Sequence, residues 1–357
     1  KIIDHTPGDL TATVQAGITI STLQESLGKH GQFLAIDPPL ANRATLGGTL
    51  AVGTSGPFKW QYGSLRDTVI GMKIINASGI LTKSGGQVVK NVSGYDMSRL
   101  HIGGLGTLGI IAEASLKLTP LPMREATLIS DFTSLSSCFN TALEIFKSSL
   151  MPLAITVTNS EANSKMRSIE SLGPWTLLVR LGGRPLTLQR TLSDIRNMIH
   201  NNDFSQETII DSDSSTSVWK SLSDFGWDKR TQPTLGIRVN VLPSTIPSLI
   251  KSFLRLYGKN RMPPAIVAHP AHGTILVSWF TNDHGETDDT IDNLIEKAKT
   301  LASQSGGNIV VENVPISTKS RIDVWGNIDR PQSVVQGLKT QYDPNGLLNP
   351  GRFVSDS

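Results

Sequence analysis

Glycine residues are concentrated between residues 44 and 109, which hold fourteen of the chain's 32 glycines. They stand in clusters, ATLGGTLAVGTSG and HIGGLGTLG among them, that are separated by β-branched and aliphatic residues. Glycine allows positive φ and lets the backbone approach a ligand closely. Successive N–H groups in turns form concave sites for anions without charged side chains. The pattern therefore predicts backbone turns that bind a bulky, polar, anionic ligand.

The composition argues against several other classes of protein. The net charge of this 357-residue chain is only +3 and its basic residues are spread out, so a nucleic-acid groove is not expected. No apolar run approaches the roughly 18 residues that a membrane-spanning helix needs. The single cysteine, Cys138, excludes an intramolecular disulfide and any iron–sulfur or thiolate zinc site held by this chain alone. We predict that Cys138 is a small, half-buried residue at a helix start rather than a nucleophile.

The glycine-rich part of the chain is predicted to form short strands with few helices. A strand is expected over residues 11–17, followed by a helix that Ser21 caps and that Gly28 or Gly31 ends. Residues 35–48 are expected to form a loop, because a double proline opposes a helix.

Two further strands are expected between residues 68 and 86, joined by a hairpin turn at residues 76–79. One more strand ends at Pro120 and Pro122, where glycine becomes rarer and serine more common. Because the chain exceeds the usual size of a single core, we expect two domains.

The remainder of the chain alternates strands with amphipathic helices. The expected strands are 127–130, 152–158, 175–183, 234–243, 265–280 and 308–315, and the expected helices are 134–149, 185–202, 244–258 and 289–307. This alternation predicts a sandwich in which helices cover one side of a mainly antiparallel sheet.

Five motifs occur in order along the chain: a double proline with ATLGG, SGP with YG, RD, VVKNVSGYD, and GTLG. With the closing QYDPNGLLNPGRF, they resemble the FAD-linked oxidases of the vanillyl-alcohol oxidase type, which bind FAD in a PCMH-type domain. Within that family the similarity is greatest to the FAD-binding subunits of glycolate oxidases. It is close over residues 11–122 and loose over the rest. Ordered motifs are more specific than one glycine pair, which alone is more often only a turn.

The resemblance implies an α+β fold in three parts. Residues 1–122 are expected to form the second part of a PCMH-type FAD-binding domain, and residues 123–334 an α+β sandwich that serves as the substrate or cap domain. Residues 335–357 are expected to return to the flavin site. Family members begin with a small subdomain whose glycine-rich loop wraps the pyrophosphate. That loop would precede Lys1, so the chain is expected to be a fragment of a longer protein.

The resemblance also implies which residues bind FAD, without a covalent link. The loop Pro39–Thr45 and the pair Gly47–Gly48 are expected to lie along the cofactor, with N–H groups that donate to phosphate oxygens. On an adenine-side strand, GTLGII, Gly106 and Gly109 are expected to allow close approach, and Asn349 is expected to return to the flavin edge. The full expected set is Pro39, Thr45, Leu46, Gly47, Gly48, Thr54, Ser55, Gly56, Lys90, Asn91, Gly106, Thr107, Gly109, Ile110, Ile111 and Asn349.

Some neighbouring residues have a simpler structural explanation. The glycines of the expected hairpin are predicted to lack ligand contact. Tyr62 and Tyr95 are expected to be core or interface aromatics rather than groups that stack on the flavin. The pair Arg66–Asp67 fits an ordinary surface pair.

No catalytic residue is identified by the sequence. Family members that oxidise 2-hydroxy acids carry a histidine-rich metal or base motif, and the nearest match here is His269 with His272. Their spacing of three in a loop, without an adjacent carboxylate, favours a structural or surface role, and no metal site is expected. Arg180, Arg184 and Arg238 fit either a clamp for a substrate carboxylate or ordinary solvated residues.

The implied function is that of an FAD-binding subunit of a glycolate-oxidase-like complex, which oxidises a small 2-hydroxy acid to a 2-oxo acid. Because this chain lacks cysteines for a cluster, the expected partners are a second FAD subunit and an iron–sulfur subunit. A cytoplasmic location is expected, peripheral to the inner membrane through these partners. Two alternatives remain open: a non-catalytic FAD-binding or scaffold subunit of the same complex, and a stand-alone FAD oxidase of a sugar alcohol or lactone.

Overall fold

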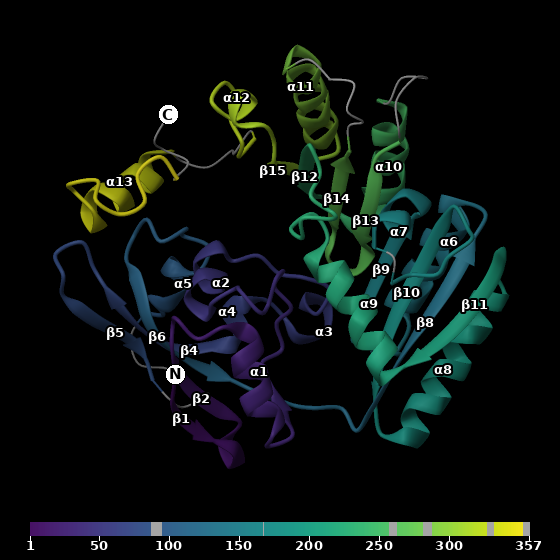
Figure 1. The fold of residues 1–357 in the computed structure, drawn as a ribbon, viewed down its shortest axis with the longest axis horizontal. Helices are drawn as coiled ribbons and strands as arrows, with labels where there is room; N and C mark the ends of the chain where they lie inside the picture. The colour runs from purple at the N-terminus through teal and green to yellow at the C-terminus, as the bar shows by residue number, and fades with distance from the viewer. Residues whose placement is uncertain (87–94, 167, 257–262, 281–287, 327–331, 353–357) are drawn as a thin grey trace. The chain divides into compact units, whose positions relative to one another are not determined.

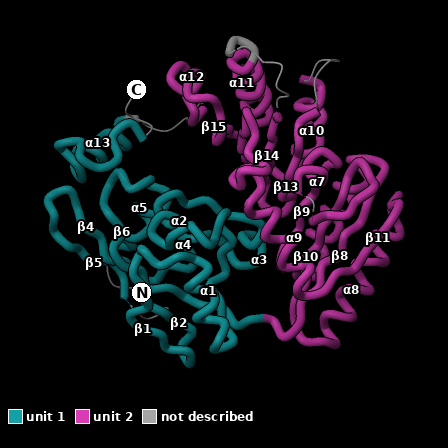
Figure 2. The backbone as a smooth tube through the Cα atoms, viewed as in Figure 1, with its two compact units in different colours: residues 1–121, 329–357 teal, residues 122–328 magenta. Residues whose placement is uncertain are grey.

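The computed structural model describes residues 1–86, 95–166, 168–256, 263–280, 288–326 and 332–352. The chain forms two compact units (Figures 1 and 2). Unit 1 comprises Lys1–Leu121 together with Asp329–Ser357, and unit 2 comprises Pro122–Ile328. Both ends of the chain therefore contribute to unit 1.

Unit 1 is built on a five-stranded sheet in which every neighbouring pair is antiparallel. The order is β1 (Ile2–Thr6), β2 (Thr11–Gln15), β6 (Ile110–Lys117), β4 (Val69–Ile75) and β5 (Leu81–Gly85). Its core contains apolar side chains of the sheet and of α1 (Ile20–Gly28) and α2 (Leu46–Val52). Shorter elements complete the unit: η1 (Pro7–Asp9), β3 (Gln32–Phe33), α3 (Lys59–Tyr62), α4 (Leu65–Thr68), α5 (Ser98–His101), β7 (Thr119–Pro120) and α13 (Gln332–Tyr342).

The predicted hairpin between β4 and β5 is confirmed, and its turn has a clear cause. The side-chain oxygen of Asn76 accepts hydrogen bonds from the N–H groups of Ser78 (3.1 Å) and Ile80 (2.9 Å). Gly79 has a φ of +78°, a conformation that glycine adopts without a steric cost.

Three local predictions in unit 1 were wrong. The helix α1 is capped by Thr19 rather than Ser21, because Thr19 Oγ1 accepts from the N–H of Thr22 (3.3 Å). The expected loop 35–48 contains the start of α2, since the prolines precede it and Thr45 caps it through the N–H of Gly48. The segment GTLGII is a strand only from Ile110 onward, because positive φ at Leu105 and Gly106 is incompatible with an extended chain.

Unit 2 contains an eight-stranded sheet in which neighbouring strands are antiparallel, as predicted. The order is β11 (Phe204–Asp211), β8 (Arg124–Phe132), β10 (Trp175–Gly183), β9 (Ala154–Asn159), β13 (Ala265–His269), β14 (Thr274–Trp279), β12 (Leu235–Asn240) and β15 (Asn308–Asn313). The single strand predicted over 265–280 is wrong. A 3-10 turn, η3 (Pro270–His272), and Gly273 at a φ of +74° divide it into β13 and β14.

Helices cover both faces of this sheet, whereas the sequence predicted one. Along β10, Leu177 and Val179 belong to one core and Leu178 to the other, because successive side chains of a strand point to opposite faces. The larger core includes side chains of α6 (Leu135–Lys147), α8 (Pro185–His200), α10 (Ile246–Arg255) and α11 (Asp288–Gln304). The smaller core includes α7 (Ser160–Met166) and α9 (Ser212–Asp224), two helices that the sequence reading missed together with β11.

The rest of unit 2 consists of short elements, η2 (Pro243–Thr245) and α12 (Ile316–Lys319). Within the described residues of the whole chain, none of the helices has the length and apolar character needed to cross a membrane.

Candidate functional site

Two segments of unit 1, distant in sequence, contact residues 103–109, which we call the glycine loop. The first segment is α2. Its residues Leu50 and Ala51 accept hydrogen bonds through their carbonyl oxygens from the N–H groups of Gly103 (2.9 Å) and Leu105 (2.8 Å). A Cβ atom on Gly53 would lie only 2.8 Å from Gly103 Cα, so glycine is required where these segments cross.

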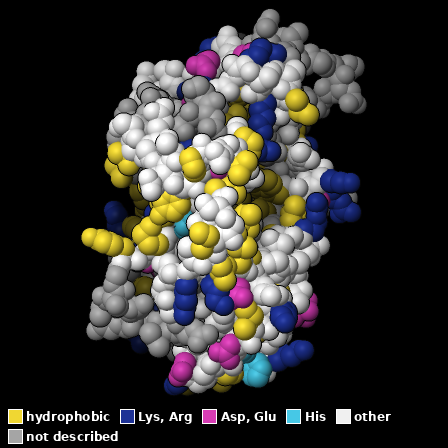
Figure 3. Space-filling view, turned by 90° about the vertical axis from the view of Figure 1, so that its left-hand side faces the viewer, with side chains coloured by type: hydrophobic (Ala, Val, Ile, Leu, Met, Phe, Trp, Pro, Cys, Tyr) yellow, Lys and Arg dark blue, Asp and Glu magenta, His cyan; other side chains and the backbone are white. Residues whose placement is uncertain are grey.

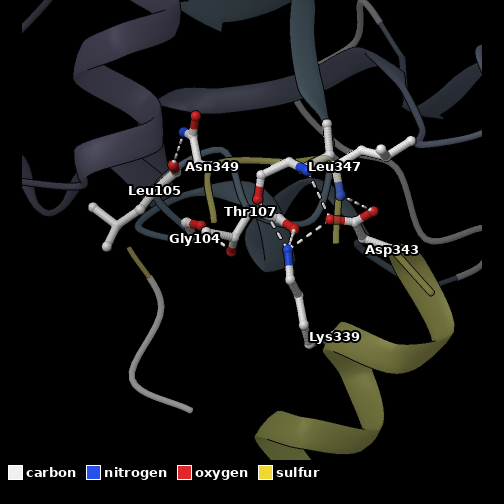
Figure 4. A network of polar contacts seen from close by, with 8 residues as sticks. Gly104, Leu105, Thr107, Lys339, Asp343, Leu347 and Asn349 are labelled. Carbon is white, nitrogen blue, oxygen red and sulfur yellow. Dashed lines mark hydrogen bonds and ion pairs between the residues drawn. The ribbon is translucent and has the colours of Figure 1, made fainter. Parts of the chain in front are cut away.

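The second segment is the C-terminal one, which makes two contacts with the glycine loop. Asn349 Nδ2 donates to the carbonyl oxygen of Leu105 at 2.6 Å, and Lys339 Nζ donates to that of Thr107 at 3.1 Å (Figure 4). These contacts join positions 244 and 232 residues apart. The prediction that Asn349 reaches a flavin is untested, but the structure does place it against the glycine loop.

The glycine loop and its anchor have an unusual backbone conformation. Leu105 has a φ of +55°, Gly106 of +71° and Asn349 of +43°. For a non-glycine residue such as Leu105, the left-handed region costs roughly 1–2 kcal/mol. Surrounding contacts must offset this cost, and residues held in this way are common at functional sites.

Most of the expected cofactor-facing glycines are required by the packing of the protein against itself. A Cβ on Gly109 would lie 2.5 Å from Ile74 Cγ2, and one on Gly47 would lie 2.7 Å from Ala16 Cβ. At Gly106 the nearest atom would be Asn349 Nδ2, at 2.9 Å. Packing alone therefore requires glycine at Gly106 and Gly109, and the expected close approach of a ligand at these two residues stays a prediction.

The N–H groups of three expected site residues already have acceptors within the protein. The N–H of Gly47 donates to the carbonyl oxygen of Ala16 (2.8 Å), and the N–H of Gly48 to Thr45 Oγ1 (3.2 Å). The N–H of Gly56 donates to a carboxylate oxygen of Asp37 (3.1 Å). These donors are therefore engaged within the protein rather than directed at phosphate oxygens.

A different set of N–H groups is available around the glycine loop. Within the described part of the chain, no acceptor is found for the backbone N–H groups of Thr54, Ser55, Gly106, Leu108 and Gly109. Leu108 is only 3% exposed, and a buried N–H without a partner is rare and costly in proteins. These donors therefore suit the acceptor atoms of a bound polar ligand.

The other expected site residues are distributed as follows. Pro39 is half-buried in the loop before Leu40, which has a φ of +52°. Ile110 and Ile111 begin β6 and pair with β4. Lys90 and Asn91 lie outside the described residues. The contact of each expected residue with FAD stays a prediction.

The sequence reading missed Lys339 and Asp343, which lie at the end of α13. Their side chains form an ion pair at 2.7 Å, with exposures of 13% and 0%. Burial alone would raise the pKa of Asp343, but hydrogen bonds from Lys339 and from the N–H groups of Leu348 and Leu347 hold it below its usual value. A Lys four residues before the Asp that begins a DPNG turn was the available signal.

His101, at the end of α5, was also missed. Its side chain is buried behind Gly109 and packs edge to face with Tyr342, with ring centroids 6.0 Å apart. Burial lowers the pKa of the ring, which is therefore neutral near pH 7. Among the described residues its Nδ1 has no hydrogen-bond partner.

The candidate arginines of unit 2 are largely engaged within the protein. Arg180 pairs with Glu125 at 2.7 Å, and Arg238 pairs with Glu312 at 2.6 Å. Arg184 is exposed immediately before α8.

The histidines and the cysteine of unit 2 have structural surroundings. His269 is 5% exposed, with Nδ1 at 3.0 Å from Thr156 Oγ1. Cys138 is fully buried in α6, deeper than predicted, and burial raises the pKa of its thiol. Across the described residues, no group of three or more His, Cys, Asp or Glu side chains is arranged to hold a metal ion.

Comparison with protein families gives two matches that divide the chain at the same place as the structure. Residues 1–85 match the FAD binding domain, and residues 121–312 match the C-terminal domain of FAD linked oxidases. The second match covers more than half of the chain. The chain belongs to the FAD-linked oxidases. Its cofactor is FAD, and the resemblance noted from the sequence is confirmed.

Three related proteins align with this FAD-linked oxidase over different lengths. The chain is 24% identical to glycolate oxidase subunit GlcD of Bacillus subtilis, over 100% of this chain and 78% of the relative. It is 38% identical to glycolate oxidase subunit GlcE of Escherichia coli, over 43% of each chain. It is 25% identical to a mitochondrial D-lactate dehydrogenase (cytochrome) of Kluyveromyces lactis, over 99% of this chain and 63% of the relative.

Solved structures agree on the fold. That of p-cresol methylhydroxylase with substrate bound has a TM-score of 0.72 at 14% identity, over 100% of this chain and 78% of that one. At this identity the similarity shows the fold alone, and the predicted α+β, PCMH-type architecture is confirmed.

The available donors of unit 1 fit FAD. This cofactor carries a diphosphate and a flavin ring with carbonyl oxygens, all of which accept hydrogen bonds. The N–H groups of Thr54 and Ser55, beside the end of α2, and those of Gly106, Leu108 and Gly109 in the glycine loop are the groups that would hold it.

Proposed function

We propose that this FAD-linked oxidase takes part in the oxidation of a small 2-hydroxy acid to a 2-oxo acid, as the FAD-binding subunit of a glycolate-oxidase-like complex. The observation that carries the FAD-binding part is the set of N–H groups in and beside the glycine loop that have no acceptor among the described residues. The substrate class rests on the relatives, which include glycolate oxidase subunits and D-lactate dehydrogenases acting on 2-hydroxy acids.

The chemistry is a two-electron oxidation at a CH–OH carbon. FAD, when held in unit 1, would supply the acceptor for the hydride of that carbon, and the hydroxyl proton would be released to a base or to water. The described residues of unit 1 contribute binding and orientation through main-chain donors. His101 cannot supply positive charge near pH 7, because its buried ring is neutral.

The second FAD subunit and the iron–sulfur subunit expected from the sequence remain part of this proposal. They would carry electrons away from the flavin and would place the complex at the membrane periphery. Unit 1 offers support in its exposed apolar residues: Ile80, Leu81, Ile110 and Leu347 are each more than half exposed. Figure 3 shows apolar side chains exposed at the surface, and exposed apolar patches are common at protein interfaces.

A second candidate is a subunit that binds FAD but does not itself oxidise substrate. The ion pairs of Arg180 with Glu125 and of Arg238 with Glu312 favour it, because a guanidinium held by a protein carboxylate is less available to a substrate carboxylate. Both candidates place FAD in unit 1.

Purification of the natural protein, with and without its partners, separates the candidates. A visible flavin spectrum that is bleached by glycolate or D-lactate, but not by acetate or propionate, which lack the hydroxyl, is expected for the catalytic subunit. Bleaching that requires the partner subunits favours the non-catalytic candidate. If the natural protein binds no flavin even with excess FAD, both candidate functions are refuted.

A further inference from the structure

We propose that Lys339 and Asn349 are positioning residues that orient two main-chain N–H groups, those of Leu108 and Gly106, toward acceptor atoms of the bound cofactor. The inference rests on the proposed FAD site in unit 1 and assigns to the C-terminal segment a defined part in it. It is carried by the geometry of two peptide groups in the glycine loop.

A peptide group is planar and trans, so its C=O and N–H point in opposite directions. Asn349 Nδ2 donates to the carbonyl oxygen of Leu105 at 2.6 Å (Figure 4). The N–H of the same peptide group belongs to Gly106. Lys339 Nζ donates to the carbonyl oxygen of Thr107 at 3.1 Å. The N–H of that peptide group belongs to Leu108. Among the described residues, both N–H groups lack an acceptor. Each carbonyl contact therefore fixes the direction of one available donor.

Lys339 is suited to this role because all three of its ammonium protons are engaged. Besides Thr107, it donates to a carboxylate oxygen of Asp343 (2.7 Å) and to the carbonyl of Leu348 (2.9 Å). A positive charge at a carbonyl oxygen also polarises the peptide group, which makes its N–H a stronger donor. The ammonium group therefore links the glycine loop to the C-terminal segment by hydrogen bonds to both.

The ion pair is not explained by helix stability. Lysine precedes aspartate by four residues, the less favourable order along a helix, and Asp343 lies at the helix end where the dipole disfavours a negative charge. Its carboxylate is instead satisfied by Lys339 and by the N–H groups of Leu347 (2.9 Å) and Leu348 (2.8 Å). The pair therefore fixes the turn that delivers Asn349 to Leu105.

The remaining contacts of the loop support a fixed conformation. Thr107 Oγ1 donates to the carbonyl of Gly104 at 2.6 Å, and the N–H of Leu105 is held by Ala51. Leu105 and Asn349 both have positive φ, and the hydrogen bond between them joins these two strained residues directly. Without Lys339 and Asn349, the peptide groups at 105–106 and 107–108 would lose their only described carbonyl partners.

The test compares FAD affinity, measured by quenching of flavin fluorescence, in the natural protein and in Asn349→Ala, Lys339→Met and Lys220→Met. Lys220 is the matched control, because it pairs with Asp224 at the same spacing and order in α9 of unit 2 (2.6 Å). Asn349→Ala and Lys339→Met are each expected to weaken FAD binding by about 10-fold or more, the effect of roughly one well-directed hydrogen bond. Lys220→Met is expected to stay within about 2-fold of the natural protein.

A second readout does not depend on catalysis. Because coupling is reciprocal, bound FAD is expected to slow tryptic cleavage after the exposed Arg352 in the natural protein, and to do so less in Asn349→Ala. If Lys339→Met fails to fold, Asn349→Ala decides the matter, because it removes no charge.

The outcomes separate this inference from the proposed function. If the natural protein binds FAD and Asn349→Ala binds it equally well, the inference is overturned while FAD binding stands. If the natural protein does not bind FAD, both are overturned. If the control variant loses affinity as strongly as the other two, the effect reflects general destabilisation and the inference is again overturned.

Discussion

We predict that His269→Gln removes a large part of the acid sensitivity of unit 2. His269 lies at the end of β13, where its side chain is buried and contacts Thr156. Burial first, and the nearby charge of His272 second, lower the pKa of His269 from 6.5 to about 3. The folded protein therefore keeps the ring neutral at pH values where an unfolded chain would protonate it.

The size of the effect follows from this difference in pKa. Between pH 6.5 and about 3, the unfolded chain binds one more proton at this residue than the folded chain does, so the free energy of unfolding falls as the pH falls. The stability that the neutral His269 side chain contributes is fully present above about pH 6.5. At about pH 5, some 1.5 pH units lower, the loss is about 2 kcal/mol, at about 1.36 kcal/mol per unit.

Urea unfolding at about pH 8 and about pH 5, followed by tryptophan fluorescence, measures this loss. Five of the six tryptophans belong to unit 2, so the signal reports mainly on that unit. Thr156→Val is the matched control. It removes the hydrogen-bond partner of His269 and no titratable group, so it is expected to lower stability by a similar amount at both pH values.

The reasoning is refuted if His269→Gln and the natural protein lose the same stability between the two pH values. The expected result also bears on chemistry. A histidine that stays neutral down to about pH 3 is a weak proton acceptor at pH 7, which agrees with a structural rather than catalytic role for His269.

Three further predictions concern packing, capping and reactivity. Gly109→Ala is expected to destabilise unit 1 by about 1–3 kcal/mol in thermal unfolding, because the added methyl group would lie 2.5 Å from Ile74 Cγ2; an unchanged midpoint would contradict this. Thr19→Ala is expected to cost about 1 kcal/mol in urea unfolding and Ser21→Ala much less; equal costs would show that the cap is misassigned. Cys138 is expected to react with a thiol reagent only after unfolding, because it is buried and the pKa of its thiol is raised; labelling of the native protein would count against this.

Elements that depend on local sequence were predictable. The β4–β5 hairpin follows from an Asn/Ser/Gly turn at residues 76–79 between two strand-like runs. The helices α6, α8, α10 and α11 follow from apolar residues at helical spacing. The helices α7 and α9 were missed because they are rich in serine and other polar residues, and their burial depends on a sheet face that only the assembled fold creates.

The candidate site was predictable only in outline. Ordered glycine motifs indicated FAD, and the resemblance implied that Asn349 returns to the flavin edge, which stays a prediction; the structure places Asn349 against the glycine loop. The motifs did not reveal which N–H groups are already bonded, because the partner of Gly47 is the carbonyl of Ala16 and that of Gly56 is the carboxylate of Asp37. Lys339 was missed because its partner Thr107 lies 232 residues earlier in the chain.

The discontinuous make-up of unit 1 has a consequence for biosynthesis. Thr107 is synthesised long before Lys339. At about 5–20 residues per second, the 232 residues that separate them take roughly 10–50 s to make. During that interval the nascent glycine loop has neither of its C-terminal anchors, while unit 2 is already being completed. FAD is therefore expected to bind late, after translation of the whole chain. Pulse-labelled nascent chains made from an mRNA that ends before codon 339 are expected to bind no FAD.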